Sequence, residues 1–72
     1  SHKDRIFRRK RDKEAFLSRM QETAKLFDVI LYGYCLMDNH FHLLVQTLNP
    51  NISKFMQRLQ GGYANWFRTK YG

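Results

Sequence analysis

The sequence predicts an α+β fold in which a helix, two antiparallel strands and a second helix follow one another. Three observations support this order. Apolar residues recur at helical spacing over residues 13–27 and again over residues 52–70, and a hairpin pattern fills residues 29–47 between them. With 72 residues, of which 43% are hydrophobic, the chain has enough apolar side chains for one small core. We therefore expect a single domain spanning residues 1–72.

The first helix is predicted from an apolar stripe on one of its faces. Its members are Phe16, Leu17, Met20, Ala24 and Phe27. Asp12 precedes the stripe, and a short carboxylate can accept hydrogen bonds from the free amides of a first helical turn. We therefore expect Asp12 to be the N-cap.

The hairpin is predicted from two strand-like runs joined by Asp38-Asn39, a turn-forming pair. Residues 29–37 are rich in β-branched and aromatic side chains and apolar on both faces, with Cys35 expected as a small buried hydrophobe. Residues 40–47 alternate, which directs His40 and His42 to one face and leaves the other face for the core. A two-stranded sheet has open edges, so we expect a larger sheet or an oligomer to complete it.

The second helix is predicted from the longest helical pattern in the chain, with Asn51 placed to cap its start. The apolar stripe comprises Ile52, Phe55, Met56, Leu59, Tyr63, Trp66 and Phe67. Gly61-Gly62 interrupts it, which predicts either a kink or the close approach of a backbone or phosphate.

The charge balance predicts a polyanionic partner. Thirteen Lys and Arg residues oppose six Asp and Glu residues, for a net charge of +7, and residues 3–13 form a basic lead-in. Such a surplus attracts nucleic acid, although a solvated basic surface is the alternative.

The single cysteine indicates a reducing, cytoplasmic location, and no apolar run is long enough to span a membrane. Ser1-His2 resembles the remnant of a cleaved tag, so His2 is excluded from the site.

His40-Phe41-His42 is the one cluster with metal-binding geometry. Residues two apart on a strand project from the same face, so both imidazoles can reach one divalent ion. The pattern alone is weak, because two histidines on a half-buried strand are often structural.

The stretch from Tyr34 to Val45, YCLMDNHFHLLV, resembles the signature of the single-tyrosine transposases. These are the insertion-sequence-200-like and REP-associated members of the HUH endonuclease superfamily, whose motif is a His, an apolar residue and a His. Residues 5–17, 51–59 and 63–67 are also similar to family segments. The resemblance therefore covers most of the chain and implies part of a ferredoxin-like domain.

The resemblance also implies a reaction and its participants. His40 and His42 would bind Mg²⁺ or Mn²⁺, and a tyrosine would cleave and rejoin single-stranded or hairpin DNA through a phosphotyrosine intermediate during transposition. A homodimer associated with the nucleoid is implied as well. The basic residues assigned to the DNA backbone are Arg8, Arg9, Lys10, Arg11, Lys54, Arg58, Arg68 and Lys70.

The chain departs from the family at the nucleophile, a tyrosine that lies on a later helix four residues before a Gln or Asn metal ligand. Tyr32 and Tyr63 are followed four residues later by Leu36 and Phe67, whose side chains cannot bind a metal. Tyr34 is followed at that spacing by Asp38, but Tyr34 lies on a predicted strand and not on a helix, and Tyr71 has no residue four positions later in this sequence. We therefore expect the nucleophile beyond Gly72, together with a missing third ligand and a missing first strand, so that this fragment is inactive alone.

Three alternatives remain open from the sequence. Tyr63 is a candidate nucleophile, although its place on the apolar stripe favours core packing. The chain as a whole could instead be a basic DNA-binding module without metal chemistry, or a dimerisation module.

Overall fold

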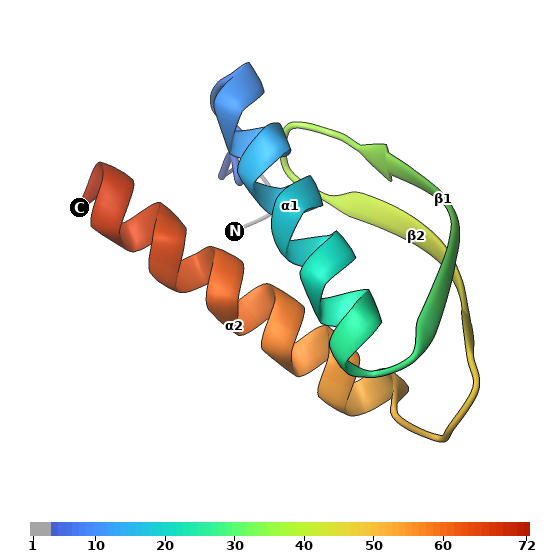
Figure 1. Ribbon diagram of the computed structural model, residues 1–72. Coiled ribbons are helices and arrows are strands. Elements are labelled where there is room, and N and C mark those ends of the chain that lie inside the picture. The colour runs from blue at the N-terminus through green and yellow to red at the C-terminus, as the bar shows by residue number, and fades with distance from the viewer. Residues whose placement is uncertain (1–3) are drawn as a thin grey trace.

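The computed structural model describes residues 4–72 and contains two helices and a hairpin in the predicted order. The elements are α1 (Lys10–Leu26), β1 (Val29–Leu36), β2 (Phe41–Thr47) and α2 (Ile52–Tyr71), so the α+β class is confirmed. Both helices lie on the same side of the antiparallel hairpin (Figure 1). Ser1, His2 and Lys3, which include the expected tag remnant and the first residue of the lead-in, lie outside the described residues.

Helix α1 begins three residues earlier than predicted, and the prediction that Asp12 is its N-cap is wrong. Arg9 holds the N-cap position with an extended backbone, and Asp12 lies in the first turn. The Asp12 carboxylate nevertheless accepts hydrogen bonds from the backbone N–H groups of Arg8 at 2.8 Å and Arg9 at 3.0 Å. It thus satisfies amides at the helix start from within the helix rather than from before it.

The hairpin is joined by Asp38-Asn39, as predicted, and a bulge divides β1 into two parts. Leu31 pairs with Val45 but Gly33 pairs with Leu44, so one extra residue is inserted in β1. Because partners in an antiparallel pair share a face, the insertion exchanges the inward and outward positions of the rest of the strand. Cys35 therefore lies on the exposed face, and the prediction that it is buried is wrong.

The core lies between the two helices and the inner face of the sheet. Helix α1 packs against β1 and against α2. The buried hydrophobic residues are Phe7, Phe16, Met20, Ala24, Val29, Phe55, Leu59 and Tyr63. Phe7 comes from the basic lead-in, and the backbone N–H groups of Ile6 and Phe7 both donate to the Asp38 carbonyl, at 2.8 and 3.0 Å. The lead-in is thus fastened to the hairpin turn.

Helix α2 runs without interruption through Gly61-Gly62. A Cβ built on Gly61 meets nothing within 4 Å, and one on Gly62 meets only the Arg19 Cδ at 4.0 Å. Within residues 4–72 no backbone therefore approaches this point closely. Asn51 stands at the N-cap as predicted, but its side chain donates instead to the Phe27 carbonyl at 2.8 Å. Neither helix of the described chain is long and apolar enough to cross a membrane.

Candidate functional site

The two histidines lie on the exposed face of the hairpin, opposite the face that carries the helices. His42 stands in β2 across from Cys35, and His40 immediately precedes the strand at the turn. Both side chains are exposed, and their ring centroids are 5.2 Å apart with the rings nearly perpendicular, at 87°. The alternation of β2 therefore brings both imidazoles to one accessible place, as the sequence predicted.

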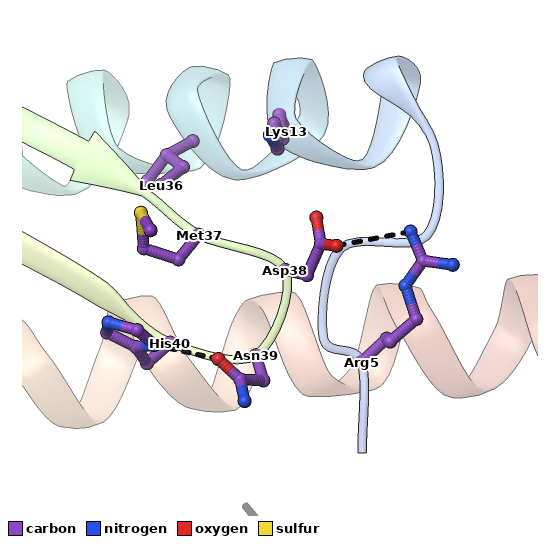
Figure 2. A pocket seen from close by; sticks show the side chains of 7 residues that line it. All are labelled: Arg5, Lys13, Leu36, Met37, Asp38, Asn39 and His40. Atoms are coloured by element: carbon purple, nitrogen blue, oxygen red, sulfur yellow. Dashed lines mark hydrogen bonds and ion pairs between the residues drawn. The ribbon is translucent and has the colours of Figure 1, made fainter. Parts of the chain in front are cut away.

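Asn39 holds the His40 ring in one orientation. The Asn39 Oδ1 lies 2.7 Å from the His40 Nδ1 (Figure 2). Because a carboxamide oxygen only accepts hydrogen bonds, this contact is a hydrogen bond in the tautomer whose Nδ1 carries the proton. In the neutral ring the lone pair is then on Nε2, which is the arrangement that leaves Nε2 available to a metal ion.

The separation of the two rings is compatible with both imidazoles binding one divalent ion. With each imidazole nitrogen ~2.1 Å from an ion, two rings on that ion have centroids roughly 4.5–5.5 Å apart, which agrees with the 5.2 Å observed. Residues 4–72 contain no group of three or more His, Cys, Asp or Glu side chains that could hold a metal. The remaining positions would therefore fall to other donors, such as water and phosphate oxygens, which both Mg²⁺ and Mn²⁺ accept.

Most of the predicted DNA-binding residues gather at one end of the molecule. The start of α1 meets the end of α2 there, because the Tyr71 hydroxyl donates to both oxygens of Asp12, at 2.7 and 2.8 Å. Arg8 places its guanidinium 4.6 Å from the Tyr71 ring centroid and 5.3 Å from that of Phe67. The cations at this end, hereafter the basic end, are Arg8, Arg9, Lys10, Arg11, Arg68 and Lys70.

Lys54 and Arg58 are separated from the basic end. Both lie in the first half of α2. A rise of 1.5 Å per residue puts Lys54 roughly 21 Å along the helix axis from Arg68. One phosphate group therefore cannot contact both sets of cations, and the predicted DNA-binding residues divide into two.

At the basic end, the Asp12 carboxylate is fully buried and is surrounded by hydrogen-bond donors. Burial alone would raise the pKa of Asp12, but hydrogen bonds from Tyr71 and from the Arg8 and Arg9 backbone outweigh burial and lower it overall. The pKa of the Tyr71 hydroxyl is raised by its loss of solvent and by its bond to Asp12. At neutral pH this contact therefore joins an ionised carboxylate to a neutral phenol.

Tyr63 lies in the core on the helix side of the sheet. It is 7% exposed, and its hydroxyl donates to the Ile6 carbonyl at 2.5 Å. Burial raises the pKa of this hydroxyl, and the charge of Asp12 raises it further. The hydroxyls of Tyr32 and Tyr71 also have acceptors, Gln46 and Asp12 respectively. These positions favour a structural role for Tyr63.

Sequence reasoning missed two cations that line the same depression as His40. Arg5, from the lead-in, and Lys13, from α1, line a depression of about 560 Å³ together with His40 (Figure 2). Arg5 also forms an ion pair with Asp38 at 3.4 Å. No short-range pattern could have found this grouping, because it depends on the docking of the lead-in against a turn more than 30 residues away.

Comparison with known proteins gives one family. The family model described as "Transposase IS200 like" matches residues 1–72. No curated protein and no solved structure matches the chain.

Proposed function

Because this chain belongs to the IS200-like transposase family, we propose that its histidine pair and basic end bind a divalent ion and DNA for strand cleavage and joining. Membership of a transposase family implies an interaction with DNA. The single observation that carries the metal proposal is the placement of His40 and His42. Their rings share an exposed face at a separation that suits one ion.

His40 and His42 would hold Mg²⁺ or Mn²⁺ through their Nε2 atoms, with Asn39 keeping the His40 ring in position. An ion bound there would polarise the scissile phosphate of single-stranded DNA. The residues of this chain would then orient that phosphate. The cations nearest to the turn, Arg5 and Lys13, are placed to attract the DNA backbone.

The proposed chemistry is a transesterification by a tyrosine. Its hydroxyl oxygen forms a bond to phosphorus while the bond from phosphorus to the 3′ oxygen breaks, giving a 5′-phosphotyrosine and, after proton transfer, a free 3′ hydroxyl. We propose that the attacking tyrosine lies outside residues 1–72. The support is that three of the four tyrosine hydroxyls, those of Tyr32, Tyr63 and Tyr71, are bonded to acceptors other than the histidines. The fourth tyrosine, Tyr34, pairs with Leu43, so it lies on the sheet face opposite to that of His42.

A homodimer is part of the same proposal. The sheet has two strands, so each strand has one edge that no other strand of residues 4–72 covers. Its outer face also exposes large apolar side chains, among them Tyr32 at 62% and Leu44 at 66%. Edges and faces of this kind favour association with another chain. Sedimentation at increasing protein concentration tests this, and a monomer throughout would refute it.

A Mn²⁺ titration followed by NMR tests the metal site. Paramagnetic Mn²⁺ should broaden the ring resonances of His40 and His42 at ion concentrations that leave the His2 ring, an internal reference, unaffected. His42→Ala should remove the selective broadening of His40. Gln46→Ala, a change on the same strand face, is the matched control and should preserve it.

Selective Mn²⁺ binding, measured together with DNA affinity, separates the metal site from the competing candidate, a basic DNA-binding module without metal chemistry. The lack of a third ligand group within residues 4–72 favours that candidate. Under our proposal, His42→Ala abolishes selective Mn²⁺ binding and leaves the affinity for single-stranded DNA nearly unchanged, because the phosphate contacts lie elsewhere. If Mn²⁺ broadens all three histidines equally while DNA still binds, the competing candidate is correct.

A further inference from the structure

We propose that two adjoining depressions beside His40 form the path of a single-stranded DNA backbone across this chain, with Arg5 and Lys13 as phosphate contacts. The inference rests on the proposed function, because it names where the DNA of that same site would run. It adds two residues that neither the sequence pattern nor the family match assigns. It also assigns Asp38 as the group that competes with the phosphate.

The first depression lies between the hairpin turn, the lead-in and α1. Its volume is about 560 Å³, and its charged and polar lining comprises Arg5, Lys13, Asp38, Asn39 and His40. Figure 2 shows how these side chains come from three separate segments, with Lys13 above the turn and Arg5 on the far side of Asp38 from His40. The depression therefore begins at the proposed metal ligand and leads away from it.

The second depression continues the first toward the basic end. Its volume is about 250 Å³, and it is lined by Phe7, Arg8, Arg9, Lys10, Lys13 and Asp38. Lys13 and Asp38 line both depressions, so the two share a wall. Together they connect His40 with the cations at the start of α1.

The chemistry of this path suits phosphodiesters. Five Lys or Arg side chains line the two depressions, against one carboxylate, Asp38. The backbone N–H groups of Arg8 and Arg9 are already bonded to Asp12. At these two residues the attraction for an anion therefore comes from the side chains, which suits a flexible, sequence-independent contact with a nucleic-acid backbone.

Asp38 is placed to compete with a phosphate for Arg5. The ion pair spans 3.4 Å, and the two side chains are 57% and 63% exposed. A pair this exposed contributes little to stability and is easily exchanged for another partner. The Asp38 backbone carbonyl, by contrast, anchors Ile6 and Phe7. Asp38→Asn should therefore remove the competing charge and leave the anchoring contact in place.

The test measures the binding of a fluorescein-labelled single-stranded oligonucleotide by fluorescence anisotropy over a series of NaCl concentrations. Lys13→Gln should weaken binding about two- to fivefold, the range for one exposed charge contact, and should reduce the salt slope of log K by about 0.7. Lys25→Gln is the matched control, since it makes the same change in the last turn of the same helix. It should change the affinity less than Lys13→Gln does.

Two variants that each remove a negative charge complete the test. Asp38→Asn should strengthen binding about two- to fivefold, because it removes one charge that repels phosphate and frees Arg5. Glu22→Gln removes the same charge from an exposed site elsewhere on α1 and should have a smaller effect. Circular dichroism of each variant confirms that the helices remain folded.

Each outcome decides the inference. Equal losses in Lys13→Gln and Lys25→Gln, or weaker binding by Asp38→Asn, would overturn the path while leaving DNA binding intact. A duplex of the same sequence that shows the same variant pattern at higher affinity would overturn the assignment to single strands. If the unsubstituted chain binds no DNA at any salt concentration, the proposed function itself fails. If the variant pattern holds but the Mn²⁺ titration is negative, the path stands and the metal site does not.

Discussion

Replacing Tyr71 by phenylalanine tests the contact that joins the two ends of the chain. The substitution removes one hydroxyl group, which donates to the buried Asp12 carboxylate at 2.7 and 2.8 Å from its two oxygens. The ring remains, so its packing against Phe67, with centroids 4.7 Å apart, and against the Arg8 guanidinium is preserved. The variant therefore isolates the hydrogen bond.

The expected loss is a measurable fraction of the stability of a small domain. Tyr71 is only half-buried at the last residue of α2, so water can replace part of its bond to Asp12. For a domain of 72 residues, a loss of this kind is visible as a shift of several degrees in Tm. We therefore expect Tyr71→Phe to lower Tm by roughly 5 °C at neutral pH.

The pH dependence of the loss follows from the lowered pKa of Asp12. The Tyr71 hydrogen bond is one cause of that lowering, after the opposing effect of burial. A carboxyl whose folded pKa is depressed contributes stability above its unfolded pKa of ~3.9, and that contribution disappears as pH falls through the folded pKa. The difference between the wild type and Tyr71→Phe should therefore be largest at neutral pH and should shrink below about pH 4.

The measurement is thermal unfolding followed by circular dichroism from neutral to acidic pH. Tyr32→Phe is the matched control, because its hydroxyl donates to Gln46 at 2.7 Å on an exposed surface. We expect it to change the free energy of unfolding by less than about 0.5 kcal/mol, as for most surface changes. If the two variants lose equal stability, or if the Tyr71→Phe loss does not depend on pH, the Tyr71 hydroxyl does not stabilise the fold through an ionised Asp12.

Three further predictions concern the helix, the site and the core. Gly61→Ala should stabilise the protein by up to about 1 kcal/mol in thermal unfolding, because α2 is continuous there and the added methyl group meets no atom within 4 Å; a loss of stability would indicate an unrecognised close contact. Asn39→Ala should weaken Mn²⁺ binding by roughly tenfold or more and shift the His40 ring tautomer in ¹⁵N spectra, because Nδ1 loses its acceptor; an unchanged tautomer would contradict the positioning role. Phe7→Ala should cost about 3–5 kcal/mol, since Phe7 is 1% exposed, whereas Leu44→Ala, on a side chain that is 66% exposed, should have little effect on denaturant midpoints; similar midpoints for the two would contradict the core assignment.

The elements were predictable because their periodic patterns reflect burial directly. The alternation of β2 placed His40 and His42 on the exposed face, and the structure agrees. The apolar stripe of α2 likewise identified Phe55, Leu59 and Tyr63, which are buried. In both elements most residues follow one period, so a short window of sequence was sufficient, although Ile52, predicted on the stripe of α2, is 43% exposed at the first residue of the helix.

The errors arose where a local irregularity or a long-range contact decided the structure. Cys35 is exposed because the bulge after Leu31 reverses the alternation of β1, and nothing in the apolar run announces that insertion. Asp12 has the residue type of an N-cap but occupies the third helical position, from which its carboxylate accepts from the backbone N–H groups of Arg8 and Arg9. The burial of Phe7 was missed because the surrounding charges are typical of a solvent-exposed segment, whereas Phe7 packs against the distant residues Phe16 and Tyr63.

The double anchorage of the lead-in on the Asp38 carbonyl has a mechanical consequence. The part of the lead-in that precedes α1 lies outside every helix and strand and is bonded to the turn that immediately precedes His40, and Phe7 anchors this segment in the hydrophobic core. Movement of the turn would therefore require the lead-in to move as well. A substitution that loosens Phe7 should therefore alter the spacing of the two imidazoles, so the geometry of the proposed metal ligands would depend on an aromatic ring on the opposite side of the sheet.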